Sequence, residues 1–277
     1  GRGCFVLGLT PYTCSMCLLN PLVDKLLRAT ALLLLIALSA ACSCLEADGP
    51  VITEEREVGE FDVVNQSGEV RMTLDYTAGA DAALSITTEQ SLFEAIEVNV
   101  DNQVLTVNTT ECFNGTNGIF ADVTAGKLRE LHLEGSDSLI AGNLFIDGDL
   151  RMLHDGQGVL YVQSLLTPDN LVIEHSGTGR LVVDDIRADT VRVNLVNSGT
   201  VVLEGSADVL ELTIEGIGIA RLLEMPVQSA TVNVQGNGRA EVNAFGSLTI
   251  DVARQGEVFY RGANPDISGD GSVTQVN

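Results

Sequence analysis

The stretch Leu171-Val-Ile-Glu-His-Ser-Gly-Thr-Gly-Arg-Leu-Val-Val183 decides the fold. It holds two short runs in which apolar and polar residues alternate, joined by a Gly-x-Gly turn. Alternation with a period of two is typical of a strand with one buried side, and glycine marks tight turns between such strands. The stretch therefore predicts a strand, a corner and a second strand.

Similar segments recur from Gly126 onward, for example Leu210-Glu-Leu-Thr-Ile-Glu-Gly-Ile-Gly218 and Thr231-Val-Asn-Val-Gln-Gly-Asn-Gly238. We expect glycine at each corner because a tight corner needs either a positive φ or a close approach of one coil to the next. The corner glycines, 15 to 21 residues apart, are Gly158, Gly179, Gly199, Gly218, Gly238, Gly256 and Gly271.

A repeat of about 20 residues accommodates two or three short strands with their corners, which is one coil of a solenoid. One coil cannot bury its apolar row alone, but stacked rows of Val, Leu and Ile form a continuous core. The sequence therefore predicts an all-β solenoid with coils of about 20 residues. The spacing shortens toward the C-terminus, which indicates a taper or cap.

Before the repeats, residues 57–107 contain further alternating runs, which we predict to be strands at 61–64, 70–74, 84–87, 96–100 and 104–107. Residues 57–277 are expected to form a single domain. The polar segment 42–56, rich in Asp and Glu, is expected to be a tether between an anchor and that domain.

Residues 1–41 are predicted to hold an export signal. Lys25 and Arg28 precede the uncharged run 29–41, which is too short to span a bilayer and ends in small residues. Residues 1–15 are expected to be upstream read-through before Met16. Cys42 follows Ala40-Ala41 and resembles the acylated cysteine of a bacterial lipobox, although Ser39 stands where that motif has Leu; plain cleavage after Ala41 is the alternative. Cys44 and Cys112 could pair in an oxidising compartment.

The run from Arg56-Glu-Val-Gly-Glu-Phe-Asp-Val-Val64 to Gly256-Glu-Val-Phe-Tyr-Arg-Gly-Ala-Asn-Pro-Asp-Ile-Ser-Gly-Asp-Gly-Ser-Val273 resembles the auto-transporter adhesin head GIN domain family, also known as DUF2807. The resemblance covers residues 56–277. It implies a right-handed parallel β-helix in a bacterial envelope protein, often a lipoprotein, with no established activity.

The composition limits the partners. The formal net charge is −23, which disfavours nucleic acid and anionic membrane surfaces. Aromatic residues make up 4% of the chain and Trp is absent, so the apolar residues are mainly Val, Leu, Ile and Ala, which suit thin stacked β layers.

Few residues are candidates for chemistry. The Gly-x-Gly turns lack the third glycine and the following helix of a nucleotide site. The chain has three histidines, His132, His154 and His175. His154 and His175 each lie two residues before a turn glycine, one repeat apart, so we expect them to stack on adjacent coils. They are either part of a metal site, with Asp155 or Glu174 as a further ligand, or two surface residues at equivalent positions. Carboxylates such as Asp147, Asp149, Asp184 and Asp185 are interpreted as a solvated face.

We therefore expect a bacterial envelope module, exported to the outer membrane or cell surface, that is structural or adhesin-like and has no enzymatic activity, cofactor or metal. Its expected partners are the membrane, through a lipid anchor only, and an envelope or extracellular polymer or protein. Two alternatives remain open. A polysaccharide-acting β-helix enzyme would show a tight groove with converging acids and an arginine; a sensory or regulatory lipoprotein is the other.

Overall fold

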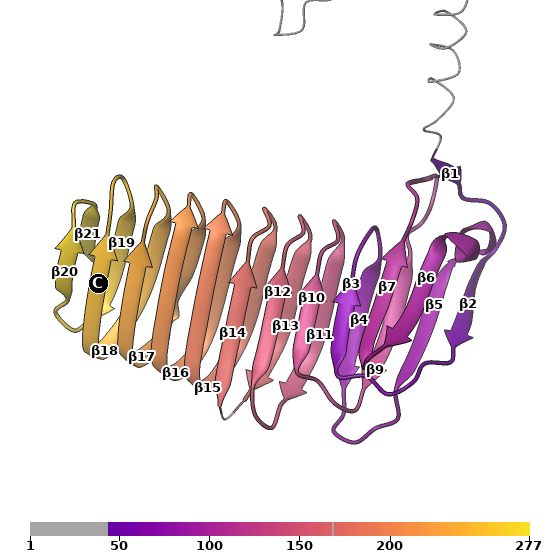
Figure 1. The fold of residues 1–277 in the computed structure, drawn as a ribbon, viewed down its shortest axis with the longest axis horizontal. Coiled ribbons are helices and arrows are strands. Elements are labelled where there is room, and N and C mark those ends of the chain that lie inside the picture. Colours follow the sequence, from indigo (N-terminus) through magenta and orange to yellow (C-terminus); the bar gives the residue numbers. More distant parts are fainter. Residues whose placement is uncertain (1–43, 168) are drawn as a thin grey trace, which may run out of the picture. The chain divides into compact units, whose positions relative to one another are not determined.

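The structure is a computed structural model that describes residues 44–167 and 169–277, and β-strands make up most of them (Figure 1). The one helical element among these residues is the short 3-10 helix η1 (Gln90–Ala95). The export signal predicted over residues 1–41 and the predicted acylation site Cys42 lie outside the described residues.

The strands that precede the glycine corners form one stacked array, which we call sheet 1. Corresponding residues of successive coils pair in parallel, as His154 of β12 does with His175 of β14. In spatial order, sheet 1 contains β6 (Ile96–Asp101), β7 (Val104–Thr109), β3 (Val63–Gln66), β10 (Glu130–Leu133), β12 (Leu150–His154), β14 (Asn170–His175), the C-terminal halves of β15 (Arg180–Asn197), β16 (Thr200–Gly216), β17 (Ile219–Val234) and β18 (Arg239–Val252), and β20 (Asp266–Gly269).

The strands that follow the glycine corners form the opposite array, sheet 2. The long strands β15 to β18 belong to both sheets because each continues through the second, glycine-poor corner. In spatial order, sheet 2 contains β2 (Val51–Arg56), β5 (Ala83–Glu89), β9 (Phe120–Ala125), β4 (Arg71–Tyr76), β11 (Ser138–Phe145), β13 (Val159–Leu166), the N-terminal halves of β15 to β18, β19 (Glu257–Gly262) and β21 (Ser272–Gln275). A separate parallel pair joins β1 (Leu45–Glu46) to β8 (Phe113–Asn114).

The core lies between the two sheets, where inward-facing side chains at equivalent positions of successive coils form continuous rows. Ile173 pairs with Val193, Val193 with Leu212, and Leu212 with Val232, and all four side chains are buried. Each row thus extends the apolar surface of the coil before it, as repeat architectures require. The predicted fold, a parallel β-solenoid with coils of about 20 residues, is confirmed.

The corner glycines are needed for space and not for a left-handed backbone. None of the seven predicted corner glycines has a φ in the left-handed region. A Cβ added to Gly179 would lie 2.7 Å from Cε1 of His154, and one added to Gly238 would lie 2.5 Å from Cγ2 of Ile214. Of the two reasons expected for glycine at these corners, close approach of successive coils is therefore the one that applies.

The N-terminal part departs from a simple stack. The predicted strands are present, but the coil formed by β3 and β4 lies between the coil β7–β9 and the coil β10–β11. Antiparallel strands β5, β6 and β2 close this end (Figure 1). Residues 51–56, expected to belong to a tether, instead form β2, so the ordered fold begins before Glu57. At the other end β20 and β21 form a short last coil, in agreement with the predicted taper.

Candidate binding groove

The histidine pair lies inside the solenoid. His154 and His175 occupy equivalent positions on β12 and β14, as predicted, and their rings stack with centroids 4.4 Å apart and planes 5° apart. Both side chains are buried. The interpretation of the pair as surface residues is therefore wrong, and among the residues that the structure describes no three His, Cys, Asp or Glu side chains are placed to hold a metal ion.

The two rings differ in their hydrogen bonds. The ring nitrogens of His175 lie 2.8 Å from the His154 carbonyl oxygen and 3.0 Å from that of Gly179, so whichever nitrogen carries the proton has an acceptor. Neither ring nitrogen of His154 has a partner in the described residues. Burial, reinforced by the neighbouring His175, lowers the pKa of His154 to about 4. His154 is thus a neutral core residue at physiological pH.

His132 belongs to the outer surface. Its Nε2 atom lies 3.0 Å from Oδ2 of Asp155 and 3.4 Å from Oε1 of Glu134. Glu174 faces Arg151 at 2.9 Å. Asp155 and Glu174, which sequence proximity grouped with the histidine pair, thus have their partners on the outer surface, and the alternation of the strands separates them from the buried rings.

The candidate carboxylates on sheet 2 do not form an acid–base pair. Tyr161 donates a hydrogen bond of 2.8 Å to Asp184, and this bond raises the pKa of Tyr161. Asp185 has a φ of 50° and lies 3.8 Å from Nε of Arg187. A general acid in glycan cleavage needs a raised carboxyl pKa, whereas hydrogen bonds from neighbouring residues lower the pKa values of Glu89, Asp149 and Asp155.

Glu89 has the largest of these shifts, and its role is structural. It is buried and accepts hydrogen bonds from the backbone N–H and the side-chain Nδ2 of Asn117, at 2.8 and 2.6 Å, and from Thr116 at 2.8 Å. The backbone hydrogen bond from Asn117 is the main reason why the pKa of Glu89 falls to about 2. Glu89 therefore fastens the 111–118 loop to the end of the solenoid.

The outer surfaces of the two sheets differ in polarity. On sheet 1 the outward positions of the later coils carry Thr, Asn, Glu and Asp. On sheet 2 one outward row reads Ile140, Tyr161, Val182 and Val202 on successive coils. Ile140 is 38% exposed, and the other three are half-buried by their neighbours. Sheet 2 therefore presents an apolar outer row that sheet 1 lacks.

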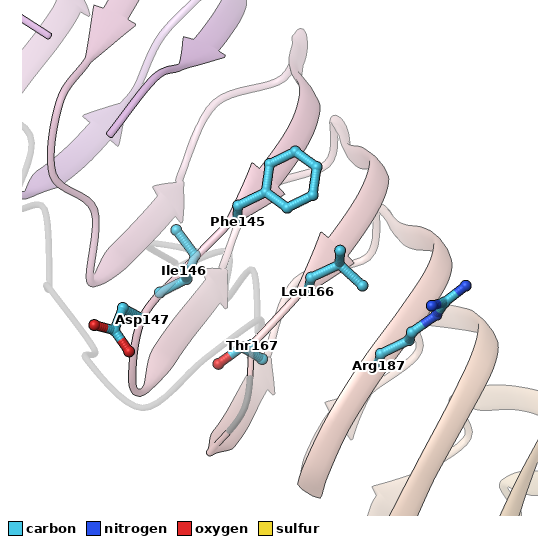
Figure 2. Close-up of a pocket in the computed structure, with 6 residues that line it drawn as sticks. All are labelled: Phe145, Ile146, Asp147, Leu166, Thr167 and Arg187. Atoms are coloured by element: carbon cyan, nitrogen blue, oxygen red, sulfur yellow. The ribbon is translucent and has the colours of Figure 1, made fainter. Parts of the chain in front are cut away.

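A groove lies along the glycine-poor corner, and we call it the corner groove. Phe145, Leu166 and Arg187 stand side by side on β11, β13 and β15 (Figure 2). They line a depression of about 420 Å³, which adjoins a second of about 410 Å³ through Thr167 and Arg187. The corner groove as a whole is lined by Phe145, Ile146, Asp147, Leu166, Thr167, Arg187, Ala188, Asp189, Ser206, Ala207, Asp208, Pro226 and Phe245.

A row of carboxylates follows the same corner. Asn170, Thr190 and Val209 pair on successive coils, so the residues before them, Asp169, Asp189 and Asp208, are also in register. All three are exposed, and within the described ranges no Lys or Arg forms an ion pair with them. Successive coils are about 4.8 Å apart, so these like charges lie close together along one rim of the groove.

The comparisons place the chain in a family. Residues 60–264 match the family described as "Putative auto-transporter adhesin, head GIN domain". The chain belongs to this family. The resemblance found in the sequence is thereby confirmed, and the ordered solenoid is a head GIN domain.

Solved structures share this fold at low sequence identity. A "putative adhesin" from Parabacteroides merdae has a TM-score of 0.76 and 18% identity, over 84% of this chain and 99% of that chain. A "putative lipid binding protein" from Parabacteroides distasonis has a TM-score of 0.71 and 19% identity, over 84% and 99%. A "putative adhesin" from Bacteroides fragilis has a TM-score of 0.62 and 19% identity, over 84% and 100%. No curated protein matches the sequence.

Two further observations bear on location. Among the described residues no helix is long and apolar enough to cross a bilayer. Cys44 and Cys112 are both disulfide-bonded, which is typical of proteins in oxidising compartments. An adhesin-type family agrees with an exported envelope or surface protein.

The corner groove was not predicted from the sequence. Its apolar residues Phe145, Leu166 and Phe245 belong to different coils, and nothing in the local sequence connects them. Alignment of the repeats on the glycine-poor corner, in place of the glycine corner, would have placed Asp169, Asp189 and Asp208 in one column. Such an alignment would have predicted that the three carboxylates lie in one row.

Proposed function

We propose that this GIN domain is an adhesin-like binding module of the bacterial envelope, that it is lipid-anchored through Cys42, and that it catalyses no reaction. The observation that supports this function best is the corner groove, which extends over successive coils and carries exposed apolar and acidic groups. Such a surface suits contact with an extended partner, where many weak contacts add up.

The acids of the groove favour binding over catalysis. The groove contains Asp147, Asp189, Asp208 and Arg187, the residue types that a glycan-cleaving enzyme would use. Glycosidases hold two carboxyl groups on opposite sides of one bond, whereas Asp189 and Asp208 lie in register along one rim. An open surface that extends over several coils can bind a polymer without placing catalytic groups on both sides of one bond.

The anchor would keep the module close to the membrane. Leu45, the first residue of β1, follows Cys42 by three positions. A fully extended chain spans roughly 3.5 Å per residue, so an acylated Cys42 would hold the folded unit within roughly 10 Å of the membrane surface. Partners of the envelope itself are therefore within easy reach.

Incubation with pectin, alginate and peptidoglycan fragments, with and without Ca²⁺, tests the non-enzymatic part of this proposal. We expect no cleavage products, and we expect retention of the purified protein on isolated cell envelopes that weakens as salt increases. Asp184→Asn with Asp185→Asn should change neither result. Reproducible cleavage that a local acid substitution abolishes would establish the enzyme instead, and absence of any envelope retention would remove the binding role.

A further inference from the structure

The corner groove combines an apolar floor with an acidic rim. Phe145 and Phe245, near its two ends, are 57% and 62% exposed, so both rings are available for contact with an occupant. Between them the floor carries the apolar residues Leu166, Ala207 and Pro226, while Arg187 and Ser206 continue the row of Leu166 on the next two strands. An occupant must therefore supply apolar groups along the floor.

The rim adds a second requirement. Asp189 and Asp208 line the groove, Asp169 continues their row, and the whole chain carries a net charge of −23. Arg187 is the one cation of the lining, and Asp185 lies 3.8 Å from it. Charge complementarity therefore calls for an occupant with positive charges, spaced along the solenoid axis.

The length of the groove fits a short extended segment. Phe145 lies on β11 and Phe245 on β18, and the strands β13, β15, β16 and β17 lie between them. Five inter-strand steps of about 4.8 Å give roughly 24 Å. At about 3.3 Å per residue, this is the length of about seven residues in a β conformation.

Other occupants fit less well. A second copy of this chain would bring the same acidic rim to the interface, and like charges facing each other oppose association. A cationic polysaccharide would satisfy the rim, but its hydroxylated rings would bury less apolar area against Phe145, Leu166 and Phe245 than apolar side chains would. An extended polypeptide with alternating apolar and basic side chains places one kind on the floor and the other toward the rim.

We infer that the corner groove binds an extended polypeptide segment of about seven residues, in which apolar and basic residues alternate. This inference rests on the proposed function and specifies the partner chemistry. Phe145 and Phe245 hold the apolar side chains, while Asp169, Asp189 and Asp208 receive the ammonium or guanidinium groups.

Three capped heptapeptides test the inference by fluorescence anisotropy on the full-length protein. They alternate Leu with Lys, Ser with Lys, and Leu with Glu. We expect the Leu-Lys peptide to bind about tenfold more tightly than the Ser-Lys peptide, because only the former fills the apolar floor. The Leu-Glu peptide should not bind, because its charges match those of the rim.

Matched variants locate the site. Phe145→Ser with Phe245→Ser should weaken Leu-Lys binding about tenfold, with an unchanged melting midpoint because both rings are more than half exposed. Ile217→Ser is the control, since Ile217 is also 62% exposed but lies at the glycine corner. Asp189→Asn with Asp208→Asn should weaken binding and flatten its salt dependence, whereas Asp251→Asn on sheet 1 should not.

Three results would overturn the inference. Equal affinity for the Ser-Lys and Leu-Lys peptides would mean that the peptides are attracted nonspecifically by the net charge of −23. Unchanged binding in the double Phe variant would place the peptide elsewhere. Tighter binding of chitosan oligomers than of the Leu-Lys peptide would identify a cationic glycan as the occupant. In each case, salt-sensitive retention on envelopes would leave the proposed binding function intact.

Discussion

At the scale of single residues, the alternation of strand side chains between core and surface decides what a polar side chain can do. His154 follows Leu150 and Met152 by even steps, and those two residues face the core. The even spacing therefore puts His154 inside, while His132, opposite Leu153 in the next strand, points outward. The spacing of one repeat predicted the stacking of His154 on His175 correctly. To predict whether the pair is on the surface or in the core, one also had to count that His154 lies an even number of residues from Leu150 and Met152.

The burial of His154 predicts a pH-dependent stability. Its pKa is about 4 in the folded chain and ordinarily 6.5. Between these values the unfolded chain binds a proton that the folded chain does not, so stability falls as the pH decreases through this window. His154→Leu should remove this contribution. Thermal melts at pH 7 and pH 4.5 should show a fall that is smaller by about 5 °C in the variant than in the wild type.

Two features make this test selective. His154→Leu should melt no lower than the wild type at pH 7, because the substitution also removes buried ring nitrogens that have no partner. Leu150→Ala, a core substitution on the same strand that removes no titratable group, should lower the melting midpoint by a similar amount at both pH values. If the melting curves of His154→Leu and the wild type shift in parallel with pH, His154 does not titrate as proposed.

At the scale of elements, the coil is the unit that the sequence specifies. Alternation and glycine spacing predicted the strands and the corners of residues 126–277, because each coil repeats the same pattern. The order of the N-terminal coils could not be predicted. β3 pairs with β7 and β10, both distant in sequence, and an alternating run reads the same whether its partner is near, distant, parallel or antiparallel.

The corner glycines give a test that separates crowding from backbone strain. Gly238→Ala should destabilise the domain by about 1–3 kcal/mol because the new methyl group would crowd Ile214. In an Ile214→Ala background, the same substitution should cost about 1 kcal/mol less, since the added space accepts the methyl group. Urea unfolding of the four proteins measures this coupling.

Gly205 is the matching control, because a Cβ added there would clash with backbone atoms of Ile186 and would not contact Ile214. Its φ is +122°, so an alanine there is strained whatever space surrounds it. Gly205→Ala should destabilise the domain to the same extent with or without Ile214→Ala. A Gly238→Ala penalty that Ile214→Ala leaves unchanged would instead assign the cost at Gly238 to the backbone.

At the scale of the whole molecule, the proposed acylation of Cys42 determines with which cell fraction the protein is found. Cys42→Ala should move the protein from the membrane fraction to the soluble fraction, because the substitution removes the site of the acyl group that would anchor it. Fractionation with immunodetection, and mass spectrometry of the mature N-terminal peptide, measure the change. Ser43→Ala is the control that keeps the cysteine. A Cys42→Ala protein that still fractionates with membranes would contradict acylation at this residue.

The position of the β3–β4 coil has a consequence for assembly order. These strands precede all of their neighbours in the stack along the chain. Their two edges stay open until β7 and β9 cover one side and β10 and β11 cover the other. The solenoid therefore cannot be completed as a simple zipper from its N-terminal end. The β3–β4 coil has to form while both of its edges are still unpaired. Only from β12 onward can each new coil pair with the coil that precedes it in the chain.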